Sequence, residues 1–305
     1  MPSDCIALFS NTFHGIFIWF GDILACYAVV GFIAVLIINQ STKTINGILI
    51  GCAILSVLFG VTLSATGSSF GSDPELNTIM KFFSAENELR VFQQGTYFEQ
   101  LLLRSVIFIL AGISYLFLLP CFLGLFLMGT RLAQIGAIQS PDQHLPLLKK
   151  LIGFGLGLGL PLNSLIFFAN TPESRFMLQS LIELIFGPIL AIGLFACFLL
   201  LAHRISNRQI ALPLVKIGRV SLSVYLLQSL LCTFYFYSWG LKRFGTHSLQ
   251  ELFLVVFGVW ILCGCFAWAW LRKFDIGPVE WLWRSWDGKY KLPWKTPAPP
   301  PVQGN

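Results

Sequence analysis

Long apolar segments separated by short polar connections dominate the chain. Seven such segments lie at residues 22–39, 45–66, 104–129, 149–169, 178–202, 213–237 and 249–271. Each is close to the roughly 20 residues that an α-helix needs to cross the hydrocarbon core of a bilayer. The pattern therefore predicts an all-α fold, a polytopic bundle of about seven transmembrane helices.

The composition supports an integral membrane protein in contact with the lipid bilayer. Apolar residues make up 56% of the 305 positions and charged residues only 11%, whereas soluble domains carry about a quarter charged residues. The net charge of +6 comes mostly from connections on one side of the membrane, which argues against nucleic-acid binding. The eight cysteines are scattered and form neither a disulfide framework nor a zinc pattern, so no metal and no cofactor is expected.

The distribution of basic residues predicts the orientation of the helices. Of the 20 Lys and Arg residues, fourteen fall in one set of alternate connections and six in the other. Cytoplasmic connections are enriched in Lys and Arg, so the richer set is placed inside, together with the C-terminus. His14 and Asp22 are then outside. Seven spans with an external start and no cleaved signal are unusual, which indicates that helices preceding this sequence are missing.

A single membrane domain is expected to cover residues 1–292. Its longest connection, residues 67–103, is polar and acidic and is interpreted as an external loop. Residues 272–292 follow the last span as a juxtamembrane segment whose tryptophans lie at the level of the lipid headgroups. Residues 293–305 are rich in proline and polar, and they are expected to be disordered.

Glycines recur with a spacing of four residues inside the spans. Three such pairs are Gly47 and Gly51, Gly153 and Gly157, and Gly155 and Gly159. Small residues at this spacing allow a neighbouring helix to approach closely. A dinucleotide site is very improbable for the two later pairs, because they follow no strand and lack an acidic residue at the proper distance.

Polar side chains within the spans mark candidate substrate-binding positions. Glu183 lies about 8 Å below the outer start of its helix, where an ionisable side chain is a functional candidate. If the span starts later than predicted, Glu183 is instead an exposed glutamate at the membrane interface. Asn163 and Gln228 lie about 21 and 22 Å from the cytoplasmic ends of their helices, in the outer third. Tyr225 and Ser229 share a helical face with Gln228. That face is interpreted either as the wall of a cavity or as a set of hydrogen bonds between helices.

The stretch TFHGIFIWFGDIL, residues 12–24, places one histidine and one aspartate in an apolar surrounding. Asp22 follows a glycine and precedes an apolar run, which is typical of a helix N-cap. His14 has no such local explanation. It is either a solvated residue near the interface or a general base, since its titration near neutral pH suits proton transfer.

Three ordered stretches resemble the YeiB family of bacterial inner-membrane proteins, a family grouped as a domain of unknown function. The first, FHGIFIWFGDILACYAVVGF, matches that family's HG, gDIL and Y signature through His14, Gly15, Gly21, Asp22, Ile23, Leu24 and Tyr27. The second, IGRVSLSVYLLQSLL, matches its GR, L, Y, QS helix through Gly218, Arg219, Leu222, Tyr225, Gln228 and Ser229. The third, FDIGPVEWLWRSW, matches its terminal motif through Gly277, Pro278, Glu280, Trp281, Trp283 and Arg284.

The resemblance implies an inner-membrane location and a helical organisation similar to that of membrane acyltransferases. Tyr27 joins the candidate binding residues on this ground, while the GR and GPxEWxWR motifs are interpreted as structural. Family members usually begin with a helix carrying a D, RG, A pattern, which is absent before His14 here. Pro278 is expected to start a short helix after the last span.

Three functions remain open from the sequence. The first is acyl-group transfer to a small acceptor at the external face, with His14 as general base and Asp22 orienting its imidazole. The second is a small-molecule transporter that uses Asn163, Glu183, Tyr225 and Gln228 along a path. The third is a noncatalytic remnant or partner of another membrane chain.

Overall fold

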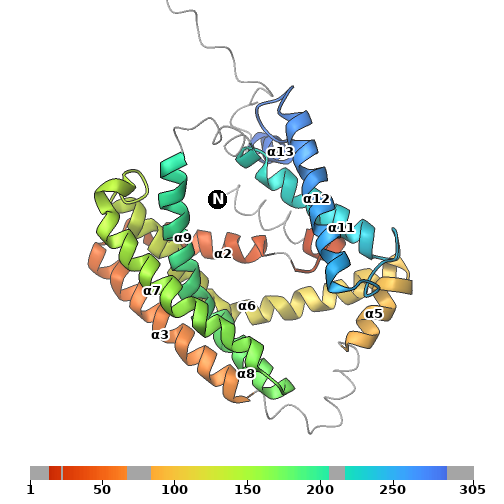
Figure 1. The fold of residues 1–305 in the computed structure, drawn as a ribbon, viewed down its shortest axis with the longest axis horizontal. Helices are drawn as coiled ribbons and strands as arrows, with labels where there is room; N and C mark the ends of the chain where they lie inside the picture. Colours follow the sequence, from red (N-terminus) through yellow and green to blue (C-terminus); the bar gives the residue numbers. More distant parts are fainter. Residues whose placement is uncertain (1–13, 22, 67–83, 206–216, 287–305) are drawn as a thin grey trace, which may run out of the picture. The chain divides into compact units, whose positions relative to one another are not determined.

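The computed structural model describes residues 14–21, 23–66, 84–205 and 217–286 (Figure 1). Within these ranges the regular elements are all helices and no strand occurs, which confirms the predicted all-α fold. The expected N-cap at Asp22 and the expected disordered tail at residues 293–305 lie outside the described residues.

Five helical stretches of the described chain are long and apolar enough to cross a bilayer. They are Thr42–Ala65, Tyr97–Gln134, Pro141–Phe168, Pro172–Ile205 and Leu249–Trp270. Two shorter apolar helices, α2 (Leu24–Ile37) and α11 (Ser221–Phe236), occupy the other two predicted spans. A helical membrane protein in contact with lipid follows, since long apolar helices expose side chains such as Leu254 and Phe198.

The chain forms two compact units. Unit 1 comprises Met1–Gly21, Ser84–Ser105 and Arg208–Asn305, and unit 2 comprises Asp22–Phe83 and Val106–Asn207. The long helix α6 (Tyr97–Gln134) contributes its first residues to unit 1 and the remainder to unit 2.

Unit 2 contains most of the apolar helices. After α2 come α3 (Thr42–Thr66), the rest of α6, the short η1 (Pro141–His144), α7 (Leu145–Ser164), η2 (Leu165–Phe168), α8 (Pro172–Leu181), the π-helical η3 (Ile182–Phe186) and α9 (Gly187–Ile205). Val30 of α2 and Leu127 of α6 are fully buried in one cluster, which also contains Ile45 of α3. This cluster holds the three helices together by apolar packing.

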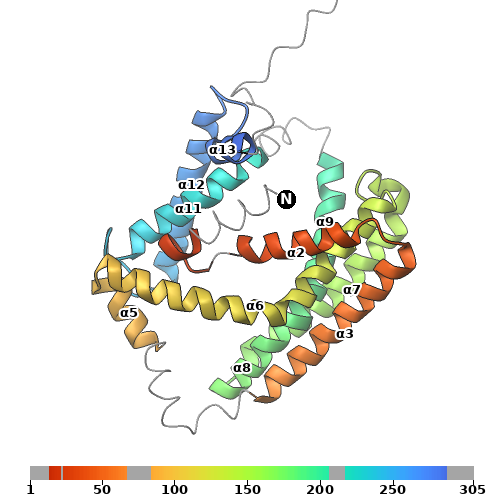
Figure 2. The same cartoon turned by 180° about the vertical axis from the view of Figure 1, so that it is seen from behind.

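Helices α7 and α9 run side by side, as both views show (Figures 1 and 2). Gly155 and Gly159 of α7 face α9, where a methyl group on Gly155 would come within 2.4 Å of Gly193 and one on Gly159 within 2.6 Å of Leu190. The predicted close approach at this glycine pair is therefore confirmed. A methyl group on Gly153 or Gly157 would meet no described atom within 4 Å.

The glycine pair in α3 does not serve the expected purpose. A methyl group on Gly47 or Gly51 would meet nothing within 4 Å among the described residues. The helices packed on α3 use other faces, and Gly60 is the α3 glycine that meets a neighbour, Ile185 of η3. Spacing alone does not determine which face of a helix is covered.

Unit 1 contains a helical turn at residues 14–17, α5 (Ala85–Gln94), the start of α6, α11, α12 (Leu249–Trp270) and α13 (Pro278–Trp286). Phe92 of α5 is fully buried and stacks on Tyr237 with ring centroids 4.4 Å apart. Phe20 and Phe244 complete this aromatic cluster. The cluster anchors α5 against the residues that follow α11.

Two features of unit 1 bear on the sequence predictions. The stretch interpreted as an external loop contains α5, and α6 begins at Tyr97, seven residues before the predicted span. Thr96 and Glu99 cause this early start, because each side chain accepts a hydrogen bond from the other's backbone amide, as in a capping box. The expected short helix at Pro278 is present as α13.

Candidate functional site

A cavity of about 470 Å³ lies in unit 1. Its lining comes mainly from α11 and the residues just after it: Tyr225, Gln228, Ser229, Cys232, Thr233, Phe236 and Tyr237, with Trp19 and Phe244. The volume falls in the range of about 300–1,000 Å³ that is common for small-molecule sites. Aromatic and apolar side chains dominate the walls, and a few polar groups interrupt them.

The polar face of α11 supplies those groups. Tyr225, Gln228 and Ser229, which the sequence places on one helical face, all line the cavity. The Ser229 hydroxyl donates to the carbonyl of Tyr225 at 3.1 Å, and the Thr233 hydroxyl donates to the carbonyl of Ser229 at 2.9 Å. Because each hydroxyl donates its proton to a backbone carbonyl of the helix, its oxygen can still accept a hydrogen bond from a ligand.

His14 lies beside this cavity in the helical turn at residues 14–17. Its carbonyl accepts from the amides of Ile18 and Trp19, which fixes the turn, and its residue is only 3% exposed. The imidazole packs on Tyr225 with ring centroids 5.5 Å apart. The solvated alternative for His14 is therefore wrong, because the side chain is buried against a residue of the cavity wall.

Arg104 is a functional candidate that sequence reasoning missed. It is fully buried near the start of α6. Its Nη1 donates to the carbonyl of Ile18 at 2.9 Å and its Nε donates to the carbonyl of Gln100 at 3.2 Å. Its guanidinium lies 5.1 Å from the ring centroid of Tyr97 and 5.8 Å from that of Tyr237. Arg104 itself does not line the cavity. It lies against Tyr237, which does, and it bonds to Ile18, the residue before the lining residue Trp19.

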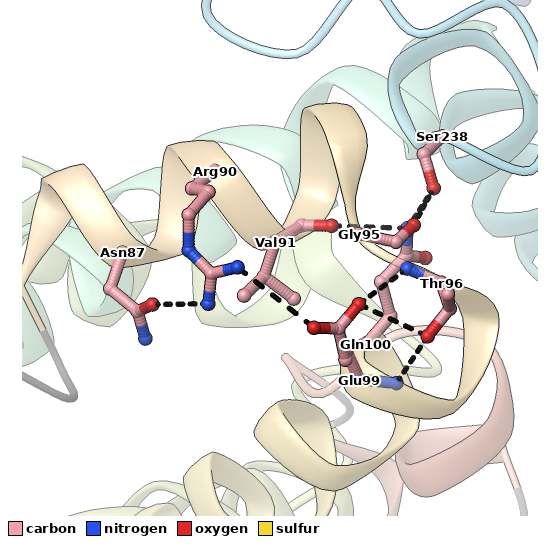
Figure 3. A network of polar contacts seen from close by, with 8 residues as sticks. All are labelled: Asn87, Arg90, Val91, Gly95, Thr96, Glu99, Gln100 and Ser238. Carbon is pink, nitrogen blue, oxygen red and sulfur yellow. Dashed lines mark hydrogen bonds and ion pairs between the residues drawn. The ribbon is translucent and has the colours of Figure 1, made fainter.

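Gln100, one turn before Arg104 and also fully buried, ties α6 to the loop after α11 (Figure 3). Its Nε2 donates to Ser238 Oγ at 2.6 Å and to the carbonyl of Val91 at 3.3 Å. Ser238 in turn donates to the carbonyl of Gly95. The network fixes the start of α6, and therefore the position of Arg104, relative to the end of α11.

The sequence does contain a signal from which Gln100 and Arg104 could have been placed in α6, namely the one that sets the early start of this helix. The sequence TYFE, residues 96–99, has the S/T-x-x-E spacing of a capping box, and a helix that begins there carries Gln100 and Arg104 in its first two turns. The apolar pattern instead predicts a span that begins only at residue 104, which assigns Arg104 to the preceding connection.

The terminal motif positions α11 from its N-terminal end. The Glu280 carboxylate of α13 accepts from the backbone amides of Leu222 at 2.7 Å and Ser223 at 3.1 Å, and also from the Ser223 hydroxyl. Ser223 Oγ accepts from the amide of Val279 at 3.0 Å. Gly277 is required here, because a methyl group on it would collide with the Glu280 and Ser223 side chains.

The remaining motif residues have plainer surroundings. Trp281 donates its amide to the carbonyl of Gly277, as the first turn of α13 requires. Trp283 is half-buried and Arg284 is exposed. Gly218 and Arg219, just before α11, are also exposed.

The other predicted binding residues lie in unit 2. Tyr27 packs edge-on against Phe122 at 5.8 Å. Asn163 donates from Nδ2 to the carbonyls of Gly159 at 2.7 Å and Phe186 at 2.9 Å, so its amide bridges α7 and the π-helix. Glu183 is exposed and accepts from Gln179 at 3.1 Å. Asp22 lies outside the described residues.

A second cavity, of about 290 Å³, lies in unit 2. Its walls are almost entirely apolar, and the Ser56 hydroxyl that reaches it donates to the carbonyl of Cys52. The Ser56 oxygen can still accept a hydrogen bond, but this lining offers a polar ligand little else. Among the described residues there is also no group of three or more His, Cys, Asp or Glu side chains that could hold a metal ion.

The fold and site define a multi-pass helical membrane protein with a partly polar cavity beside a buried histidine. A family model described as a protein of unknown function (DUF418) matches residues 132–289, which is more than half of the chain. The chain belongs to this family, which confirms the resemblance to YeiB.

Two relatives extend the similarity over most of the chain. It is 27% identical to the uncharacterized protein YxaH of Bacillus subtilis over 289 residues, which cover 91% of this chain and 69% of YxaH. It is 29% identical to the uncharacterized protein YeiB of Escherichia coli over 284 residues, which cover 89% of this chain and 71% of YeiB. No solved structure matches the chain.

Proposed function

We propose that this protein transfers an acyl group to a small acceptor at the external face of the bacterial inner membrane, with His14 as the general base. The observation that carries the proposal is the burial of His14 against Tyr225, whose ring lines the 470 Å³ cavity. A buried imidazole next to a cavity of ligand size is placed to exchange protons with a bound molecule.

The proposed step uses a hydroxyl or amine acceptor and an activated acyl ester or thioester as donor. His14 takes the proton of the acceptor as the acceptor's oxygen or nitrogen forms a bond to the acyl carbon. The bond from that carbon to the donor's leaving group then breaks, and His14 returns the proton to the leaving group. Each proton and electron pair is thereby accounted for without a cofactor.

The walls of the cavity suit such reactants. Trp19, Phe236 and Phe244 offer apolar contact to an acyl chain. The Ser229 and Thr233 oxygens can accept hydrogen bonds from an acceptor, because their protons are directed to backbone carbonyls. Orientation of the His14 imidazole by Asp22 remains part of the proposal.

Transfer can be tested with purified protein, an acyl thioester carrying a radiolabelled acetyl or palmitoyl group, and inner-membrane vesicles from cells lacking the protein as the source of acceptor. Label should move into the vesicle fraction. His14→Ala should lower the rate by about 10²–10⁴-fold, the usual contribution of a general base. His203→Ala, at a partly exposed histidine of unit 2 that pairs with Asp142, serves as the control.

Equal transfer by wild type and His14→Ala would overturn the assignment of the base. Absence of transfer by the wild type with both donors would overturn the acyltransferase proposal and favour a noncatalytic partner of another membrane chain.

A small-molecule transporter is the second candidate, and we place it behind acyl transfer. It would rely on Asn163 and Glu183 together with residues of α11. The Asn163 amide is already used in two hydrogen bonds to backbone carbonyls, which gives it a structural task. Flux into proteoliposomes that falls in Glu183→Gln would reverse this order.

A further inference from the structure

The charge of Arg104 has no carboxylate partner in the described part of the chain. The ion pairs there involve Arg90, His203 and His247. Arginine stays protonated at any physiological pH, so burial cannot be relieved by loss of a proton. A fully buried guanidinium without a counter-charge is costly, and such groups are normally paired.

The contacts of Arg104 satisfy only part of its guanidinium. Nε and Nη1 donate to backbone carbonyls, whereas Nη2 is buried and no acceptor among the described residues lies within hydrogen-bond distance. The rings of Tyr97 and Tyr237 attract the cation, but aromatic rings do not neutralise its charge. The Nη2 donor and the positive charge of the guanidinium are therefore still without a partner among the described residues.

The surroundings indicate the kind of partner. Tyr237 lies against the guanidinium and also lines the cavity. Nη1 donates to the carbonyl of Ile18, and the next residue, Trp19, lines the cavity as well. A guanidinium binds carboxylate and phosphate oxygens with good geometry. Arg104 itself is not among the residues that line the cavity, whose walls are mainly aromatic and apolar and suit the apolar part of a ligand better than a small inorganic anion.

We infer that Arg104 binds the carboxylate or phosphate group of an amphipathic ligand whose apolar part occupies the cavity beside His14. This inference rests on the proposed function in taking that cavity as the substrate site. It names the substrate class as an anionic group attached to an apolar chain. The shared chemistry fits two sources, a free fatty acid and an anionic phospholipid.

Binding can be measured by native mass spectrometry of the full chain released from a neutral detergent. The probes are palmitate against hexadecanol, and phosphatidylglycerol against phosphatidylcholine, so that each anion has a neutral counterpart. Wild type should prefer one anion over its counterpart by about 10- to 100-fold, as expected for a charge-assisted hydrogen bond. The preferred pair identifies the source as a fatty acid or a phospholipid.

Variants then assign the preference to Arg104. Arg104→Met should abolish it and leave binding of the neutral probe unchanged, because methionine keeps an unbranched apolar side chain. Arg104→Lys should retain part of it. Arg243→Met, at an exposed arginine of the same unit, should behave as wild type.

A second readout avoids reliance on the folding of any variant. The preferred anion should raise the melting temperature of the wild type more than its neutral counterpart does, because a ligand that binds only the folded state stabilises it. If the wild type binds the anion through Arg104 but transfers no acyl group from either donor, the result counts against the proposed function alone.

Equal binding of anionic and neutral probes by the wild type would overturn the inference, as would unchanged anion preference in Arg104→Met.

Discussion

Gly155 of α7 and Gly193 of α9 meet backbone to backbone. A methyl group built on either residue would lie within 2.7 Å of the other's Cα atom. Helices in a membrane gain little from burying apolar surface against each other, since lipid is equally apolar, and they associate through close packing. This contact is therefore central to the packing of unit 2.

Gly155→Ala should destabilise unit 2, because the added methyl group forces the two helices apart. The expected cost is about 1–3 kcal/mol, typical of overpacking. Gly157→Ala is the matched control on the same helix, and its open surroundings predict a neutral effect or a gain from better helix propensity. Thermal unfolding of the two variants in detergent would compare them. Equal melting temperatures would contradict the packing role.

Removing the Glu280 carboxylate should loosen both α13 and the start of α11. Glu280→Ala leaves the amides of Leu222 and Ser223 without their acceptor, at an expected cost of about 1–3 kcal/mol. Hydrogen exchange should rise at these two amides and along α13. Glu86→Ala, at an exposed carboxylate of α5, is the control. Unchanged exchange at Leu222 would show that the cap contributes nothing.

Gln100→Ala should weaken the attachment of α5 and the start of α6 to the loop after α11. The change removes the donor to Ser238 Oγ and one of the two donors to the carbonyl of Val91, which keeps the Gly95 amide; the loss of a buried partner typically costs about 1–3 kcal/mol. Chemical unfolding and hydrogen exchange in α5 would register the loss. Gln250→Ala, at an exposed glutamine of unit 1, should leave both unchanged. If the two variants are equally stable, the network in Figure 3 is dispensable.

Glu88 predicts a pH dependence of stability. Burial raises the pKa of its carboxyl above the ordinary value of 4.5, so the folded state binds this proton more tightly than the unfolded state does. The free energy of unfolding should therefore fall as the pH rises from about 4.5 through the raised pKa, and then level off.

Glu88→Gln should remove this fall in the free energy of unfolding, because glutamine does not titrate. The variant should therefore become more stable relative to the wild type as the pH rises through that window. Unfolding measured between about pH 4 and pH 8 would follow the difference. Glu86→Gln, on the same helix, controls for the loss of an exposed carboxylate. A constant difference between Glu88→Gln and wild type across the window would refute the prediction.

The sequence predicted the helices well where an apolar run was uninterrupted. The run at residues 249–271 became α12 with nearly the same bounds, because length and hydropathy suffice to define such a helix. The start of α6 was missed since Glu99 and Arg104 break the apolar run. Charge marks the end of a span only when it is exposed, and Arg104 is buried.

Local spacing also gave part of the site. The face shared by Tyr225, Gln228 and Ser229 follows from helical geometry, and it lines the cavity. The contact between His14 and Tyr225 joins residues far apart in the chain, so no local pattern contains it. The same holds for the bond between Arg104 and the Ile18 carbonyl.

The cap that Glu280 provides has a consequence for biogenesis. Glu280 lies 58 residues after Leu222 in the chain. The amides in the first turn of α11 therefore have no Glu280 carboxylate to bond until that later stretch has been translated. At typical rates of 5–20 residues per second the delay is about 3 to 12 s. During this interval the nascent helix depends on water, lipid headgroups or the insertion machinery to bind its free amides. Slow translation between these positions should therefore expose the half-made protein to quality control.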